Sequence, residues 1–97
     1  MSDKLPVHHD RSGHRFEVTV DGHCAYLVYM DLGKQTLDIY RTFVPDALRG
    51  RGIAAVLAQH ALDFAEQEGY AVIPSCSYVE WYIERKSQQA EQPDGRE

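Results

Sequence analysis

The chain has no hydrophobic run long enough to cross a membrane. Among its 97 residues, no stretch approaches the roughly 18 consecutive apolar positions that a membrane-spanning helix needs. Its start, Met1-Ser2-Asp3-Lys4, also lacks the apolar core of a signal peptide. We therefore expect a cytoplasmic protein with no membrane partner.

Cysteine is scarce, and the histidines are scattered. Cys24 and Cys76 lie in different predicted elements without a metal-type spacing, so we expect two free thiols in a reducing compartment. Three of the five histidines, His8, His9 and His14, fall in or beside a leader that we expect to be flexible. Since no set of residues has zinc-like spacing, the sequence predicts no metal site.

Positive charge is outnumbered. Ten Lys and Arg against fifteen Asp and Glu give a formal net charge of −5. Nucleic-acid binding needs a basic face, and the single Arg-Gly-Arg-Gly at 49–52 is too short for an RNA-binding tract, so we expect no nucleic-acid partner. An anionic ligand would depend on local positive charge, and the overall charge favours a cationic acceptor such as an amine.

The first half of the chain has the pattern of an antiparallel meander. Alternating apolar residues predict a strand over 15–20, Asp21-Gly22 predicts a tight turn, and 23–30 is the return strand. A second turn around 31–34 leads to a third strand over 36–44. Pro45 ends this strand, because it removes a backbone donor.

The second half of the chain predicts two helices around a short strand. Apolar residues at helical spacing predict a helix over 53–68 that ends at Gly69. The strand over 70–73 should lie parallel to the third strand, since a crossover helix joins them. Ser77 and Glu80 have capping-box spacing for a last helix.

The two ends of the chain are predicted to be flexible. We expect a flexible leader over 1–13, one folded domain over 14–86 and a flexible tail over 87–97. The tail is rich in Gln, Glu, Asp, Pro and Gly, which bury too little apolar surface to fold. A chain of this size has room for one domain and at most one site.

Residues 44–54 carry the most informative motif. They connect a predicted strand to a helix N-terminus through a loop that contains Gly50 and Gly52. The first N–H groups of a helix have no intrahelical partner and lie at the positive end of its dipole, so they bind phosphate well. Glycine lets the backbone approach a ligand closely, and Arg49 and Arg51 add positive charge. The sequence therefore predicts a phosphate or pyrophosphate site.

The pattern Arg49-x-x-Gly52-x-Ala54, with Val44-Pro45 upstream, resembles the pyrophosphate-binding motif of the GNAT superfamily of acyl-CoA-dependent N-acetyltransferases. The likeness is strongest to a branch of very short, stand-alone GNAT-like proteins. In that branch, Thr-Phe/Tyr-Val-Pro leads into Leu-Arg-Gly-x-Gly-Ile-Ala, and Pro-x-Cys follows the next strand. Residues 42–45, 48–54 and 74–76 match these three elements, so the resemblance covers roughly residues 16–86.

The resemblance implies an α+β fold of three antiparallel strands, a crossover helix, a parallel strand splayed from the third, and a closing helix. The splay would form a groove for the pantetheine of acetyl-CoA. The implied cofactor-binding residues are Phe43, Val44, Arg49, Gly50, Arg51, Gly52, Ile53, Ala54, Cys76 and Tyr78. The chain departs from the full family pattern, because the strand and two helices that help wall the acceptor site are missing.

Two side chains are candidates for catalysis, each with a structural alternative. Cys76 would lie beside the cofactor thiol, where it could protonate the leaving thiolate, carry the acetyl group covalently, or pack against pantetheine. Tyr82 falls where many GNAT enzymes place a tyrosine that donates to the leaving sulfur, and it could equally belong to the core. The branch commonly has His before the Thr-x-Val-Pro run, but this chain has Arg41, so that role does not transfer.

We expect an acetyl-CoA-dependent N-acetyltransferase that acts on a small-molecule or peptide amine. The alternative is a module that binds CoA or acyl-CoA with little or no catalysis, because the acceptor walls are missing. A nucleotide binder of Rossmann type is disfavoured, since an antiparallel meander precedes the loop and Gly-x-Gly-x-x-Gly is absent. The sequence does not indicate the oligomeric state.

Overall fold

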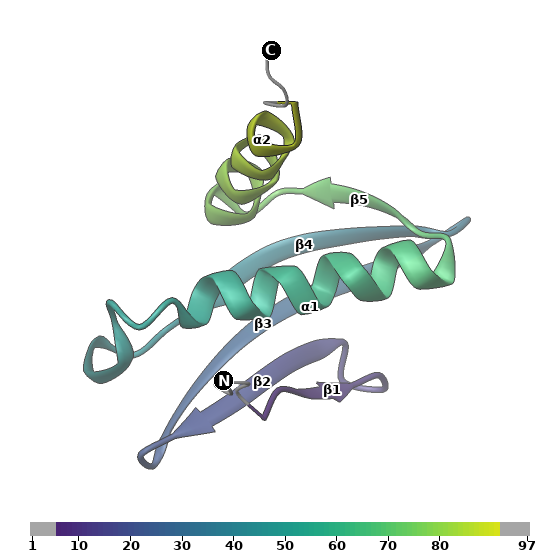
Figure 1. The fold of residues 1–97 in the computed structure, drawn as a ribbon. Coiled ribbons are helices and arrows are strands. Elements are labelled where there is room, and N and C mark those ends of the chain that lie inside the picture. Colours follow the sequence, from purple (N-terminus) through teal and green to yellow (C-terminus); the bar gives the residue numbers. More distant parts are fainter. Residues whose placement is uncertain (1–5, 92–97) are drawn as a thin grey trace.

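The computed structural model describes residues 6–91 and the side chains of residues 6–87. The described chain forms a five-stranded sheet in the order β1-β2-β3-β4-β5, with two helices (Figure 1). The elements in chain order are β1 (His8–Asp10), β2 (Arg15–Val20), β3 (His23–Gly33), β4 (Thr36–Phe43), a 3₁₀ turn η1 (Asp46–Leu48), α1 (Ile53–Glu68), β5 (Ala71–Pro74) and α2 (Ser77–Glu91).

The strand pairing confirms the predicted α+β fold. Strands β1 to β4 are antiparallel, as in the pairs Val18↔Ala25 and Leu27↔Thr42. Strand β5 runs parallel to β4, with Leu37 opposite Val72, because α1 carries the chain back along the sheet. None of the helices in the described part of the chain is both long and apolar enough to span a bilayer.

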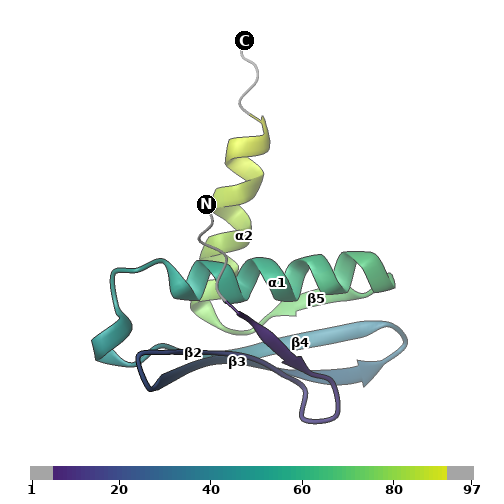
Figure 2. The same ribbon diagram turned by 60° about the horizontal axis from the view of Figure 1, so that its bottom comes forward.

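Helix α1 forms the core with one face of the sheet. Its residues Leu57 and Ala58 are fully buried, as are Leu27 of β3 and Ile39 of β4. Burying each side chain of leucine size contributes about 1.5–3 kcal/mol relative to exposure. Figure 2 shows both helices on the same side of β2, β3 and β4, with α2 rising away from the sheet. Helix α1 therefore supplies most of the helical packing on the sheet, and α2 covers only part of the sheet.

The predicted flexible leader over 1–13 is wrong at residues 8–10, which form β1. Three residues of β1 pair with β2, and the ring of His9 stacks on Phe16 with 3.9 Å between the ring centroids. This short strand is polar in sequence, and its contacts with aromatic side chains are made by the half-buried His9. Helix α2 also continues to Glu91, beyond the predicted domain boundary at Lys86. Residues 1–5 and 92–97 of the predicted leader and tail lie outside the described residues.

Strands β4 and β5 separate where the predicted groove begins. The register of β3 with β4 shifts after Val28↔Arg41 to Tyr29↔Ile39, which leaves Tyr40 as a bulge. The parallel pairing of β4 with β5 ends at Ile39↔Pro74, while β4 itself continues to Phe43. After Pro74 the chain leaves β4 and enters α2 at Ser77. This separation is the splay that the sequence resemblance implies.

Candidate functional site

The loop between β4 and α1 is anchored at one buried side chain. Leu48 is only 1% exposed, and its N–H donates to the carbonyl of Pro45 at 2.9 Å, which closes the turn η1. After this anchor the chain needs two left-handed residues, Gly50 with φ of 84° and Gly52 with φ of 74°. Glycine adopts this conformation without the steric penalty of a side chain. The two glycines thus turn the backbone into the first residue of α1.

The N-terminus of α1 has no side-chain cap. Gly52 is the N-cap residue, and its carbonyl accepts the first helical bond from Val56 N–H at 3.1 Å. The N–H groups that precede Val56 in the helix have no intrahelical acceptor, and they lie at the positive end of the helix dipole. A Cβ built on Gly50 or Gly52 would meet no protein atom within 4 Å. The space beside these two glycines is therefore open.

A hollow of about 150 Å³ lies at this helix end. We call it the loop hollow. Seven of the predicted cofactor-binding residues line it, together with two others: Val44, Leu48, Arg49, Gly50, Gly52, Ile53, Ala54, Ala55 and Tyr78. Tyr78 comes from α2, so the hollow joins the loop to the second helix. Burial raises the pKa of Tyr78, which keeps its hydroxyl protonated near neutral pH.

Three predicted cofactor residues lie outside the lining of the loop hollow. The guanidinium of Arg51 is 3.2 Å from the carboxylate of Asp21 in the β2–β3 turn, so it is turned away from the hollow. Phe43 packs its ring against Tyr26 of β3 and remains 39% exposed. The third, Cys76, lies at the separation of β4 and β5. Among the loop arginines, only Arg49 contributes to the lining.

Cys76 bridges the two strands where they part. Its N–H donates to the Ile39 carbonyl at 2.9 Å, and its thiol lies 3.5 Å from Thr42 Oγ1. Its carbonyl accepts a bond from the N–H of Glu80 at 3.0 Å, which places Cys76 at the start of α2. The residue is half-buried. The structure therefore brings the thiol to the splay, close to the strand that leads into the loop hollow.

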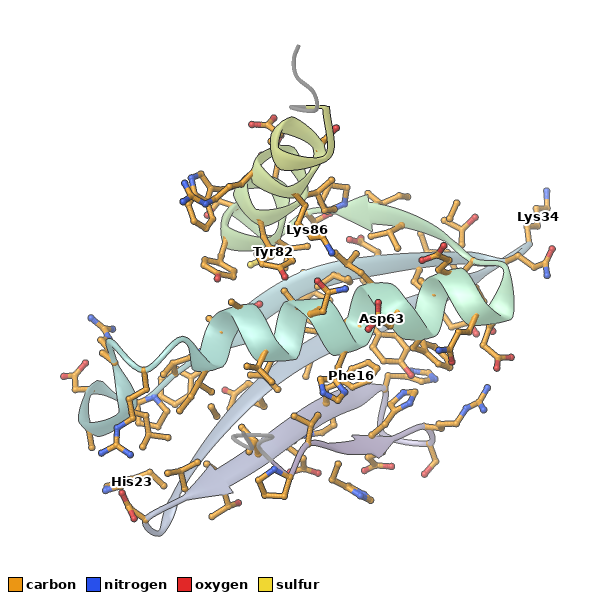
Figure 3. All side chains as sticks on the ribbon, in the orientation of Figure 1. Phe16, His23, Lys34, Asp63, Tyr82 and Lys86 are labelled. Carbon is orange, nitrogen blue, oxygen red and sulfur yellow. The ribbon has the colours of Figure 1, made fainter. Side chains whose placement is uncertain are left out.

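Tyr82 faces α1. Its hydroxyl donates to Gln59 Oε1 at 2.7 Å, and Lys86 Nζ donates to the same oxygen at 2.7 Å (Figure 3). The Gln59 amide nitrogen in turn donates to Asp63. Burial, and next the nearby Asp63 charge, raise the pKa of Tyr82. Gln59 and Lys86 were not predicted as site residues, although the four-residue spacing of Tyr82 and Lys86 places both on one face of α2.

No metal-binding cluster is found in residues 6–91, where no three His, Cys, Asp or Glu side chains lie close enough to share an ion. The site instead offers backbone N–H donors, two glycines, the Arg49 guanidinium, the Cys76 thiol and the phenols of Tyr78 and Tyr82. Such donors suit an anionic ligand with a long neutral arm better than a metal ion.

A family model described as GCN5-related N-acetyl-transferase matches residues 15–92, which is most of the chain. The chain belongs to this N-acetyltransferase family. Protein NATD1 of Xenopus tropicalis is 42% identical to it over 85 residues, which cover 84% of this chain and 77% of that protein. Protein NATD1 of Gallus gallus and that of Homo sapiens are each 43% identical over 82 residues, covering 81% of this chain and 74% and 72% of those proteins.

The family assignment confirms the resemblance to short GNAT-like proteins. The match begins at β2, so β1 lies before the part of the chain that the family model describes. The loop hollow and the separation of β4 from β5 both fall inside the matched residues. Acetyltransferases are the general class to which this domain points.

Proposed function

We propose that the protein transfers an acetyl group from acetyl-CoA to an amine. The observation that carries this proposal is the loop hollow at the uncapped N-terminus of α1, which lies in the same domain as the separation of β4 from β5 at Cys76. Open space in front of Gly50 and Gly52 fits a diphosphate held by main-chain donors. The family assignment supports the reaction class, and the net charge of −5 supports a cationic small-molecule or peptide acceptor.

The residues of the site would divide the work between binding and proton transfer. Bound acetyl-CoA supplies the acetyl group as an activated thioester. The first N–H groups of α1 and the guanidinium of Arg49 would bind the diphosphate, and Val44 and Tyr78 complete the lining of the loop hollow. Holding the reactants in place makes the attack of the amine effectively intramolecular.

Cys76 is placed to act at the reacting end. Its thiol holds a proton at Sγ, 3.5 Å from Thr42 Oγ1. As an acid, it would give that proton to the departing sulfur as the C–S bond breaks, and the acceptor would lose its own proton to water or a base. As a nucleophile, it would lose that proton to the departing CoA sulfur and attack the thioester carbonyl, so that CoA leaves as the thiol. The amine would then attack the acetyl-cysteine thioester, lose a proton and regenerate the Cys76 thiol. A third role is packing against the pantetheine arm.

Tyr82 enters this proposal as a neighbour of the site. Its hydroxyl is held by Gln59 on α1, so in this arrangement it donates away from Cys76. A catalytic role would require this bond to open. We therefore assign proton transfer first to Cys76, and keep Tyr82 as a donor that is available only after rearrangement.

The direct test supplies acetyl-CoA and a panel of amines and basic peptides, and measures the release of free CoA. Acceptor-dependent release well above hydrolysis is the expected result. Tight binding of acetyl-CoA with no acceptor-dependent release across the panel would favour a binding module. This second candidate is supported by the sheet face opposite α1, where no helix of the described chain lies (Figure 2).

Rapid quenching distinguishes the roles of Cys76. A nucleophile should carry the acetyl group when acetyl-CoA is supplied without acceptor, and peptide mass spectrometry detects that adduct. An acid should show no adduct, but Cys76→Ala should lower turnover more than it lowers CoA affinity. Unchanged turnover in both Cys76→Ala and Cys76→Ser would exclude both catalytic roles.

A further inference from the structure

A second hollow lies between α1 and α2. We call it the α1–α2 hollow. It has a volume of about 300 Å³ and is lined by Gln59, Tyr82, Arg85 and Lys86. Figure 3 shows Tyr82 and Lys86 on the side of α2 that faces α1. Every lining residue is polar, and two of the four carry a positive charge. No residue of this hollow belongs to the glycine-bearing motif.

The positive charges of this hollow are not neutralised within the described side chains. No carboxylate of residues 6–87 lies within ion-pair distance of Arg85 or Lys86. The guanidinium of Arg85 lies over the ring of Trp81, with 5.4 Å to its centroid. The nearest acid in the network is Asp63, which accepts a bond from the Gln59 amide at 2.7 Å. Two cations are thus available in a protein whose net charge is negative.

Two donors of the hollow converge on a single acceptor. The hydroxyl of Tyr82 and the ammonium of Lys86 each lie 2.7 Å from Gln59 Oε1. An oxygen of a phosphate would accept the same two bonds, and its charge would strengthen them compared with a neutral amide. Gln59 is half-buried, and a phosphate oxygen would take the place of its Oε1 once the side chain adopts another rotamer. The arrangement is therefore suited to a phosphate monoester.

The two hollows follow one another along the same pair of helices. Ala55 and Tyr78 line the loop hollow, while Gln59 and Tyr82 line the α1–α2 hollow. Each pair is separated by four residues, which is about one helical turn and a rise of about 6 Å. The ammonium of Lys86 lies 2.7 Å from Gln59 Oε1, so a ligand whose diphosphate occupies the loop hollow has this cation about one turn of α1 away.

We infer that the α1–α2 hollow binds the 3′-phosphate of CoA, an inference that rests on the proposed function. In CoA a single ribose separates the diphosphate from the 3′-phosphate. This short connection suits the one-turn spacing of the hollows. The site would make the protein discriminate between CoA and 3′-dephospho-CoA, which has the same diphosphate and the same reactive arm. Lys86 and Arg85 supply the charge, and Tyr82 supplies a neutral donor.

The test compares CoA with 3′-dephospho-CoA by calorimetric titration. The wild type should bind CoA at least about fivefold more tightly, which corresponds to about 1 kcal/mol. Lys86→Met keeps the length of the side chain and removes the charge. It should lower the affinity for CoA by about the same factor and leave that for 3′-dephospho-CoA within about twofold. Lys34→Met, in the distant β3–β4 turn of Figure 3, is the matched control and should behave as wild type.

Three results would overturn the inference, and one of them concerns the proposed function itself. Equal affinity of the wild type for both ligands would show that the 3′-phosphate makes no contact. Equal losses for both ligands in Lys86→Met would show a role unrelated to that phosphate. If neither ligand binds the wild type, the proposed function fails, and the inference fails with it. Thermal unfolding of Lys86→Met checks that the variant is folded.

Discussion

The two ends of α1 are built in opposite ways. At its C-terminus, Gly69 is left-handed and its N–H donates back to the carbonyls of Ala65 and Glu66. Tyr70 N–H adds a bond of 2.7 Å to Ala65, and the ring of Phe64 lies among His9, Phe16, Tyr29 and Tyr70. At its N-terminus, Gly52 supplies no side-chain cap, and a hollow lies in front of the first helical N–H groups.

The difference separates stability from binding. Backbone groups at the C-terminal end find partners within the protein, and aromatic packing adds apolar contact. Donors at the N-terminal end remain for a ligand, at a cost of roughly a few tenths of a kcal/mol relative to a Ser or Asp cap, because the N-cap residue is glycine. Changes at the C-terminal end should therefore weaken the fold and leave binding intact. Changes at the N-terminal end should do the reverse.

The largest expected effect on stability comes from Phe64→Ala. Truncating this ring removes its contacts with His9 and Tyr70, so the free energy of unfolding should fall by about 2–3 kcal/mol. Urea unfolding measures this loss. Phe64→Leu is the control, because it keeps most of the apolar volume and should cost less. CoA affinity, titrated where the variant is folded, should stay unchanged. A parallel loss of affinity would contradict the separation of the two ends.

Gly52→Val should have the largest effect on binding. A branched side chain at φ of 74° is strained, and it would fill the space that a diphosphate needs. CoA affinity should fall at least tenfold, or about 1.4 kcal/mol. Gly33→Val is a matched control, because Gly33 has φ of 81° and equally open surroundings in the distant β3–β4 turn. Wild-type affinity in a folded Gly52→Val protein would exclude the proposed phosphate site.

Sequence reasoning succeeded where a feature is local. The glycine-bearing loop and α1 follow from residues that are close in the chain, and α1 has the predicted bounds of 53–68. The sequence does not reveal strand β1, because His8-His9-Asp10 is polar and its packing depends on contacts of His9 with Phe16 and with Phe64, far away in sequence. A three-residue strand carries too little periodicity to reveal such a partner.

The same limit explains the site residues. Motif spacing identified seven residues of the loop hollow. It could not show that Arg51 forms an ion pair with Asp21, thirty positions away in the sequence. Gln59 and Lys86 were also missed, because they meet only through the packing of α1 against α2, and each alone is an ordinary polar residue of a helix. Contacts between distant elements depend on tertiary geometry, which a single sequence does not fix.

The two arginines of the loop, Arg49 and Arg51, test the N-terminal end of α1 through a smaller expected change in CoA affinity. Arg49 lines the loop hollow, and its ion pair with Asp46 is exposed, so its charge is available to a ligand. Arg51 is paired with Asp21 instead. Arg49→Met should therefore lower CoA affinity by about three- to fivefold, while Arg51→Met should change it by less than about twofold. Equal effects in titrations would mean that Arg51 leaves Asp21 when CoA binds.

The smallest expected effect is on stability, and it comes from the protonation of His9, which packs near the C-terminal end of α1. Its ring is stacked on Phe16 and lies 2.7 Å from the Tyr29 hydroxyl. Burial, and next the positive charge of Arg11, lower the pKa of His9 below its ordinary value of 6.5. Because the folded pKa is the lower one, the unfolded chain binds more protons between the two values. His9 therefore contributes its full stabilisation above about pH 6.5, and this is lost as the pH falls toward the folded pKa.

Urea midpoints measured from pH 7.5 to pH 5 test this dependence. His9→Phe keeps a flat aromatic ring on Phe16 but cannot take up a proton, so its stability should decline less than that of the wild type as the pH is lowered. His23→Phe, at the exposed start of β3, is the control and should retain the wild-type pH dependence. CoA affinity should not follow the state of His9, because the ring packs around Phe64 near the other end of α1. An identical pH dependence in the wild type and His9→Phe would show that protonation of this ring does not act on the packed end of α1.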